Sequence, residues 1–383
     1  LEIGMPGLGK DFLKRCQPKE DFIPLLRKPN SRRIFAVRHA LHCGMSIEEL
    51  FEHTSIDPWF LRQIRDLLAV EEELRSFPLA ETLAADNPAL APMLRRAKEH
   101  GFSDRQLGNL WKRSEDDIRA LRKTLGILPT YYLVDTCAAE FAAYTPYFYS
   151  TYESGSEVAV RDGRKVIILG GGPNRIGQGI EFDYCCVHAA FALRELGIES
   201  IMVNCNPETV STDYDTSNKL YFEPLTVEDV LSIYEKEKPE GVIVQFGGQT
   251  PLNIARELAE AGVRILGTTW DTIDLAEDRD RFRMVMERLG IPQPKSGMAV
   301  SVDEALAIAA DIGYPLMVRP SYVLGGRGME VVHDDDMMRQ YMAAAVGVTP
   351  ERPILIDKFL ENATECEADA ICDGTDEIGR AHV

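Results

Sequence analysis

Apolar residues recur at helical spacing through about the first 130 residues, and residues typical of helix starts precede them. Ser46 followed by Glu49 forms a capping box, in which side chain and backbone cap each other. Asp57 before Pro58 places a capping residue ahead of a first-turn proline. The pattern predicts an all-α first third. The apolar residues expected to line one face of the helix after Pro58 are Phe60, Ile64, Leu67 and Leu68.

Beyond residue 165 the pattern changes to short apolar runs that alternate with helical stretches. Such alternation predicts a parallel sheet with crossover helices, which is a Rossmann-like α/β domain. The apolar runs lie at 166–169, 200–203, 242–245 and 264–266, and the helical stretches near 184–196, 227–236 and 251–261.

From residue 276 a helix leads into β-rich sequence, which predicts a second domain of the α+β class. Its expected strands lie near 316–319, 329–332, 354–358 and 366–371. The fold class is therefore multidomain. The expected divisions are a helical domain over 1–150, a linker over 151–164, a Rossmann-like domain over 165–275, an α+β domain over 276–376 and a tail over 377–383.

The charge balance disfavours nucleic acid and membrane surfaces as partners. The 61 acidic residues against 42 basic residues give a net charge of −19, which repels phosphate backbones and anionic lipids. A small anion such as ATP can still bind, because local arginines and backbone N–H groups outweigh a distant average field. No apolar run is long enough for a membrane span, and the eight cysteines show no CxxC spacing, so we expect a cytoplasmic location.

Polar clusters follow the first three predicted strands of the parallel sheet. The glycine-rich loop over 170–179 fails the dinucleotide fingerprint because Arg175 stands where a glycine is needed. Two more polar clusters, over 204–213 and 247–250, follow the next two strands. Parallel strands present their carboxyl ends at one edge, so these loops predict a functional edge. A tight turn without a ligand remains the alternative for the glycine-rich loop.

A second glycine-rich segment, over 319–328, lies between two expected strands of the α+β domain and is typical of a hairpin. Its glycines let backbone N–H groups approach a triphosphate, and Arg319 at the strand end can neutralise phosphate charge. A simple turn is the alternative. Five residues could be written as a metal cluster but match no zinc spacing: Cys16, His39, His42, Cys43 and His53.

Several sequence segments together resemble the large subunit of carbamoyl phosphate synthetase. The resemblance extends over residues 31–374 and includes the specific motif Gly-Gly-Gly-Pro-Asn-Arg-Ile-Gly-Gln-Gly from Gly170. It implies an oligomerisation domain, a pre-ATP-grasp domain and the start of an ATP-grasp domain from the enzyme's second, carbamate-phosphorylating half. The other segments that are similar to the family lie at 135–141, 180–184, 202–213, 245–250 and 276–279.

The resemblance also implies which residues handle the nucleotide. Arg279 and Arg319 resemble the family's phosphate-contacting arginines and are the expected catalytic residues, while Gly325 and Gly326 fall in the loop that closes over the phosphates. Phosphoryl transfer depends on positioning and on charge stabilisation, which suits arginines and backbone donors. The residues that fall where the family contacts adenine and ribose are Lys358, Leu360 and Glu365. A solvated surface carboxylate is the alternative for Glu365.

Cofactors and partners are implied in the same way. ATP and Mg²⁺ or Mn²⁺ are expected for the intact enzyme, but no metal ligand is expected in this chain, because the family's ligands come later in the ATP-grasp domain. The implied partners are a glutaminase small subunit and further copies of the helical domain. The implied activity is an ATP-dependent, glutamine-hydrolysing ligase that makes carbamoyl phosphate from bicarbonate, ammonia and two ATP for arginine and pyrimidine biosynthesis.

Two other classes of function stay open. The chain could be a catalytically inactive association scaffold, or a nucleotide-dependent dehydrogenase built on the parallel sheet. A dehydrogenase of this kind needs an acidic residue after the second strand to bind the ribose of the dinucleotide, whereas amide residues stand there.

Leu1 in place of Met suggests a piece of a longer protein, and residues 377–383 resemble a translated sequencing adapter. We therefore expect a non-native tail and a loosely ordered stretch over 315–376.

Overall fold

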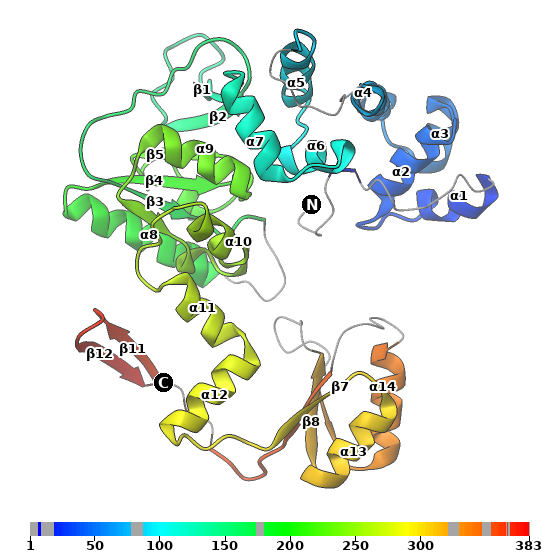
Figure 1. Ribbon diagram of the computed structural model, residues 1–383, viewed down its shortest axis with the longest axis vertical. Coiled ribbons are helices and arrows are strands. Elements are labelled where there is room, and N and C mark those ends of the chain that lie inside the picture. The colour runs from blue at the N-terminus through cyan, green and yellow to red at the C-terminus, as the bar shows by residue number, and fades with distance from the viewer. Residues whose placement is uncertain are drawn as a thin grey trace. The chain divides into compact units, whose positions relative to one another are not determined.

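The computed structural model describes residues 7–8, 19–77, 87–173, 180–320, 329–346, 354–364, 366 and 368–382 (Figure 1). These fall into two compact units. The first comprises Leu1–Pro173 with Glu181–Thr268, and the second comprises Asn174–Ile180 with Thr269–Val383.

The first unit begins with helices that pack around two buried apolar clusters. One cluster centres on α2 and α3, and the other joins the later helices through Leu74, Leu94 and Trp111. The helices are α1 (Lys19–Arg27), α2 (Arg33–His42), α3 (Ile47–Thr54), α4 (Pro58–Ser76), α5 (Leu90–Glu99), α6 (Asp104–Trp111) and α7 (Glu115–Thr124).

The predicted helix starts are confirmed at atomic detail. Ser46 Oγ accepts a hydrogen bond from Glu49 N at 3.1 Å, and Ser46 N donates to Glu49 Oε2 at 2.9 Å. Asp57 Oδ1 accepts from the backbone of the first turn of α4 at 2.7 Å. The predicted apolar face was wrong at Phe60, whose side chain is 57% exposed, because Leu61 is the residue that faces the core.

A mixed sheet of six described strands follows the helices. Its order is β1-β2-β5-β4-β3-β6, with β3 buried along its whole length and β2, β5, β4, β3 and β6 parallel. Crossover helices link the strands, as the alternating pattern predicted. The elements are β1 (Thr130–Leu133), β2 (Tyr147–Thr151), β3 (Lys165–Leu169), α8 (Ile180–Glu195), β4 (Glu199–Asn204), β5 (Lys219–Phe222), α9 (Val227–Glu237), β6 (Gly241–Ile243) and α10 (Gln249–Glu260).

Strands β1 and β2 correct the expected extent of the helical domain. Both lie within the stretch 1–150 that was assigned to helices, yet β2 pairs with β5 through Tyr147 and Leu220. Tyr131 from β1 and Tyr221 from β5 pack edge to face with ring centroids 5.0 Å apart. The last strands of the stretch 1–150 therefore belong to the sheet and not to the helical domain.

Both outer strands of this sheet form hydrogen bonds with a neighbouring segment of the chain. Beside β1, Glu157 N donates to Tyr131 O at 2.8 Å, and Leu133 N donates to Glu157 Oε2 at 2.7 Å. Beside β6, Val242 N donates to Arg264 O, and Leu266 N donates to Val242 O, each at 2.9 Å. The edge strands thus have partners for these backbone groups.

A buried network of charges joins the helices to the sheet. Arg122 on α7 donates from Nε to both Asp104 oxygens at 2.9 Å, and its Nη2 lies 3.5 Å from Glu228 Oε1 on α9. Lys98 Nζ lies 3.3 Å from Asp104 Oδ1 and also contacts Glu228 Oε1. Burial alone would lower the pKa of Arg122, but Asp104 and Glu228 raise it above its ordinary value. Two cations and two carboxylates therefore compensate each other away from water.

We expect Arg122→Ala to destabilise the chain by about 3–5 kcal/mol, because it leaves the two buried carboxylates of Asp104 and Glu228 with Lys98 as the one remaining cation of the network. The matched control is Lys123→Ala, which breaks the exposed ion pair with Glu235 and should cost less than about 1 kcal/mol. Urea unfolding of both variants measures the difference. Equal losses would contradict a structural role for the buried network.

Asp229 on α9 lies next to this network. Burial raises the pKa of Asp229 to about 7, and the charge of Glu228 adds to the shift. An acid whose folded pKa lies above its unfolded value binds more protons in the folded state. The stability that Asp229 contributes is therefore present at low pH and falls as the pH rises from about 4 to about 7.

We expect Asp229→Asn to gain stability relative to the wild-type chain as the pH is raised through that window. Denaturant unfolding at a series of pH values checks the trend. Asp117→Asn is a control whose effect has the opposite sign and lies below that window, because hydrogen bonds from Ser114 lower the pKa of Asp117 from its ordinary value of 3.8. A pH-independent difference for Asp229→Asn would count against the raised pKa.

The second unit contains a sheet whose described strands have the order β7-β10-β8-β9, all antiparallel. Leu316, Val318 and Ile356 are fully buried in it. The expectation that 315–376 is loosely ordered is therefore wrong for these strands. The elements are α11 (Trp270–Glu277), α12 (Arg279–Leu289), β7 (Ser296–Ala299), α13 (Val302–Ile312), β8 (Leu316–Pro320), β9 (Glu330–Val332), α14 (Asp335–Val346), β10 (Ile354–Lys358), β11 (Ala368–Cys372) and β12 (Glu377–His382).

The hairpin of β11 and β12 crosses the expected start of the tail. Cys372 pairs with Glu377, and Ala368 pairs with His382. Residues on both sides of position 376 therefore belong to one antiparallel pair.

Candidate functional site

The parallel sheet changes direction of winding at β3. The chain passes from β3 to β4 and β5 on one side, and then crosses to β6 on the other side of β3. In open α/β sheets, ligands bind outside the carboxyl ends of the strands at such a switch point. The loops after β3, β4 and β6 meet at this edge, as the polar clusters predicted.

Asn204 at the end of β4 organises the carboxyl edge. Its Oδ1 accepts hydrogen bonds from Gly172 N at 3.0 Å and Cys205 N at 2.9 Å, and its Nδ2 donates to Ser211 Oγ at 3.2 Å. The side chain is fully buried. One amide therefore ties the glycine-rich loop to the segment after β4.

Two glycines allow these loops to approach closely. A Cβ on Gly170 would lie 2.5 Å from Asn204 Nδ2. A Cβ on Gly247, in the short 3₁₀ turn Gln245–Gly247 after β6, would lie 2.5 Å from the carbonyl oxygens of Leu169 and Gly170. Each contact is too short for a real Cβ, so glycine is required at Gly247 by the approach of backbone and at Gly170 by the packing of the Asn204 side chain.

Several buried polar atoms at this edge have no hydrogen-bond partner. Asp183 on α8 uses Oδ2 to accept from Ser211 N at 2.9 Å, whereas its Oδ1 has no partner. Gln245 Oε1 and Thr250 Oγ1 are also buried without partners. Because such atoms cost free energy when unsatisfied, they can accept donors from a polar ligand or water. Asn204 and Asp183 lie in motifs that were recognised from the sequence, but neither residue was predicted to be functional.

In the second unit, Arg319 lies at the carboxyl end of β8. Its Nη2 forms an ion pair with Asp357 Oδ2 of β10 at 3.2 Å, and its Nε is buried without a hydrogen-bond partner. The side chain is 41% exposed. Arg319 therefore keeps donor capacity beyond its ion pair, which suits a phosphate contact.

Lys358 lies at the other end of the β8–β10 ladder. Arg319 pairs with Leu355, whereas Lys358 pairs with Leu316 three residues further along β10, a separation of about 10 Å at the usual strand rise. Lys358 Nζ donates to the carbonyl oxygens of Gly313 and Tyr314 at 2.9 and 2.7 Å. Its ammonium is thus engaged by the backbone. Leu360, just after β10, is 57% exposed.

The remaining predicted site residues cannot be placed with the others. Arg279 is the first residue of α12, but its side chain lies outside the described residues. Gly325, Gly326 and Glu365 also lie outside the described residues. Within the described ranges, no group of three or more His, Cys, Asp or Glu side chains is arranged to hold a metal ion.

Domain models of known families match the chain in three consecutive pieces. Residues 1–126 match the carbamoyl-phosphate synthetase large chain oligomerisation domain, and residues 162–275 match the carbamoyl phosphate synthase preATP-grasp domain. Residues 278–379 match the carbamoyl-phosphate synthase L chain ATP binding domain. A switch-point sheet followed by an ATP-binding domain is the arrangement of an ATP-grasp ligase. The chain belongs to the carbamoyl phosphate synthase large-chain family.

Curated relatives agree with this membership. The carbamoyl phosphate synthase large chain of Archaeoglobus fulgidus is 57% identical over 99% of this chain, and that of Methanothermobacter thermautotrophicus is 58% identical over 98%. The chain spans only 35% and 34% of their respective lengths.

Similarity to solved structures is weaker. A biotin carboxylase complex from Campylobacter jejuni aligns with 57% of this chain, and the alignment covers 50% of the biotin carboxylase chain, at 16% identity and a TM-score of 0.44.

Among the described residues, none of the helices has the length and apolar character that a membrane span requires.

Proposed function

We propose that this chain supplies part of the carbamate-phosphorylating half of a carbamoyl phosphate synthase, with its second unit binding ATP. The observation that carries the proposal is the position of Arg319, whose guanidinium is half-exposed at a strand end with an unsatisfied Nε. The ladder of β8 and β10 extends about 10 Å from Arg319 to Lys358. That span suits a nucleotide with its phosphates near Arg319 and its base near Lys358 and Leu360.

The chemistry assigned to this chain is positioning and charge neutralisation. Arg319 would hold the transferred phosphoryl group, and Arg279, Gly325, Gly326 and Glu365 are proposed to complete the nucleotide contacts. Mg²⁺ or Mn²⁺ in the complete enzyme would neutralise phosphate charge. Since the described residues offer no metal cluster, no residue here is assigned to the ion.

The wider activity is proposed from family membership. The complete enzyme would be a cytoplasmic, glutamine-hydrolysing ligase that uses bicarbonate, ammonia from a glutaminase subunit and two ATP, and its product would serve arginine and pyrimidine synthesis. A dehydrogenase is disfavoured because β4 ends at Asn204, and Cys205 and Asn206 follow where a ribose-binding carboxylate is needed. An inactive scaffold remains the alternative that ATP binding tests.

We expect Arg319→Ala to weaken ATP binding by this chain, and carbamate-dependent ATP use by the complete enzyme, roughly 10- to 100-fold, because a charge-assisted hydrogen bond contributes about 1.5–3 kcal/mol. Calorimetric titration with ATP and steady-state assays measure the two effects. Arg256→Ala, which removes an exposed arginine paired with Glu260, is the control. Bicarbonate-dependent ATP hydrolysis should survive, and equal loss of both reactions would contradict the assignment.

We also propose that the helical region mediates self-association. It matches an oligomerisation domain model, and it exposes large apolar side chains on α3 and α4. Phe51, Trp59 and Phe60 are 46%, 59% and 57% exposed, and the rings of Trp59 and Phe60 pack edge to face 4.9 Å apart. Neighbouring exposed aromatics are typical of protein interfaces.

We expect the double variant Trp59→Gln and Phe60→Gln to weaken self-association, because it removes apolar area that an interface would bury. Sedimentation velocity over a range of concentrations measures the change. Tyr214→Gln, at an exposed aromatic outside the helices, is the control. A wild-type chain that stays monomeric at high concentration would contradict the proposal.

A further inference from the structure

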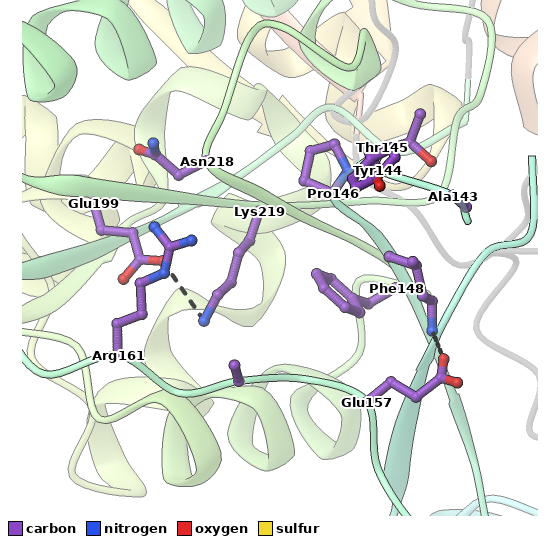
Figure 2. Close-up of a pocket in the computed structure, with 12 residues that line it drawn as sticks. Ala143, Tyr144, Thr145, Pro146, Phe148, Glu157, Arg161, Glu199, Asn218 and Lys219 are labelled. Atoms are coloured by element: carbon purple, nitrogen blue, oxygen red, sulfur yellow. Dashed lines mark hydrogen bonds and ion pairs between the residues drawn. The ribbon is translucent and has the colours of Figure 1, made fainter. Parts of the chain in front are cut away.

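A cavity of about 500 Å³ lies at the amino ends of the parallel strands, opposite the edge that Asn204 organises (Figure 2). Glu199 and Lys219 are the first residues of β4 and β5, and both line it. The segment 157–161 supplies another part of the wall. The volume lies within the range of small-molecule sites. The proposed ATP chemistry makes no use of this cavity.

Glu199 brings an incompletely satisfied carboxylate to the cavity. Its side chain is 13% exposed, and its Oε1 is buried without a hydrogen-bond partner. The nearest cation is Lys219, whose Nζ lies 3.6 Å from that oxygen. Lys219 instead donates to the two oxygens of Glu237 at 2.8 and 3.0 Å. Glu199 Oε1 can therefore accept a hydrogen bond from a bound N–H donor.

The charges behind Glu199 are already balanced. Glu237 also lies 3.5 Å from Lys165 Nζ and accepts a hydrogen bond from the hydroxyl of Tyr221 at 2.5 Å. Two buried lysines thus face Glu199 and Glu237. Arg161 and Glu157 also line the cavity and add one charge of each sign. A ligand with a net charge would therefore upset this balance, whereas a ligand with equal positive and negative charge would not.

Donors for an anionic group stand beside Glu199. Arg161 is exposed at the cavity and forms no ion pair with a described residue. Asn218 uses its Oδ1 to accept from Ser200 N at 2.9 Å and from Ser200 Oγ at 3.1 Å, which fixes its Nδ2 as a donor. A neighbouring hollow of about 320 Å³ is also lined by Arg161, Glu199 and Asn218. Figure 2 shows Arg161 beside Glu199.

The opposite part of the cavity is apolar. Phe148 of β2 lies across from the charged side chains in Figure 2, and Pro146 precedes the same strand. Leu133 of β1 and Tyr144 complete this wall. A ligand with an apolar body would bury area there.

We propose that this cavity binds a small amino acid with an apolar side chain. Its ammonium group donates to Glu199 Oε1, its carboxylate accepts from Arg161 and from Asn218 Nδ2, and its side chain packs on Phe148. A compound with only one of the two charges leaves either Glu199 or Arg161 without a partner. The cavity therefore selects zwitterions over singly charged compounds of the same shape.

Calorimetric titration of the full chain with three probes tests the proposal. L-Leucine carries both charged groups, 4-methylpentanoate lacks the ammonium, and 3-methylbutylamine lacks the carboxylate. We expect saturable binding of L-leucine and roughly 10- to 100-fold weaker binding of each singly charged compound, since each loses a charge-assisted contact. No saturable binding of L-leucine, or equal binding of all three compounds, would overturn the proposal.

Variants locate the binding site. Arg161→Gln should weaken L-leucine binding roughly 10- to 100-fold while leaving the fold intact, because Arg161 is exposed. Arg164→Gln is the matched control, since Arg164 lies three residues away and pairs with Glu240 at 2.6 Å. Glu199→Gln should reduce the preference for L-leucine over 4-methylpentanoate. Binding unchanged in Arg161→Gln, or lost equally in Arg164→Gln, would place the amino acid elsewhere.

Discussion

The contact between Arg122 and Asp104 is the interaction on which the first unit depends. Both side chains are buried, and together with Lys98 and Glu228 they connect α5, α6 and α7 to α9 of the sheet. A charged side chain that is buried away from water destabilises the fold unless oppositely charged partners are held next to it. The helices and the sheet therefore hold each other's charged residues in position.

The two edges of the parallel sheet have different chemistry for a common reason. At the carboxyl ends, close-packed glycine loops and the amide of Asn204 leave little room but several unsatisfied oxygens. At the amino ends, Glu199 and Lys219 start adjacent strands and so lie next to each other in the wall of a cavity. Parallel pairing brings like ends of strands together, and a side chain's place along a strand decides which of the two environments it enters.

Local signals were the predictable part of this chain. The capping box joins Ser46 to Glu49, only three positions later. Each apolar run of the parallel sheet is likewise recognisable within a few consecutive residues. Strands β1 and β2 were missed because β2 pairs with β5, about 70 residues later in the chain, and β1 joins the sheet by pairing with β2. The Arg319 ion pair with Asp357 and the position of Glu199 likewise depend on strand register, which no local pattern encodes.

The covered outer strands of the sheet limit how copies of this chain can meet. An uncovered strand offers a row of N–H and C=O groups onto which a strand of another molecule can add, which is the usual first step of aggregation. Here Glu157 occupies that position along β1, and residues 264–266 occupy it along β6. A strand from another molecule would therefore have to displace these residues before it could pair with either edge of this sheet.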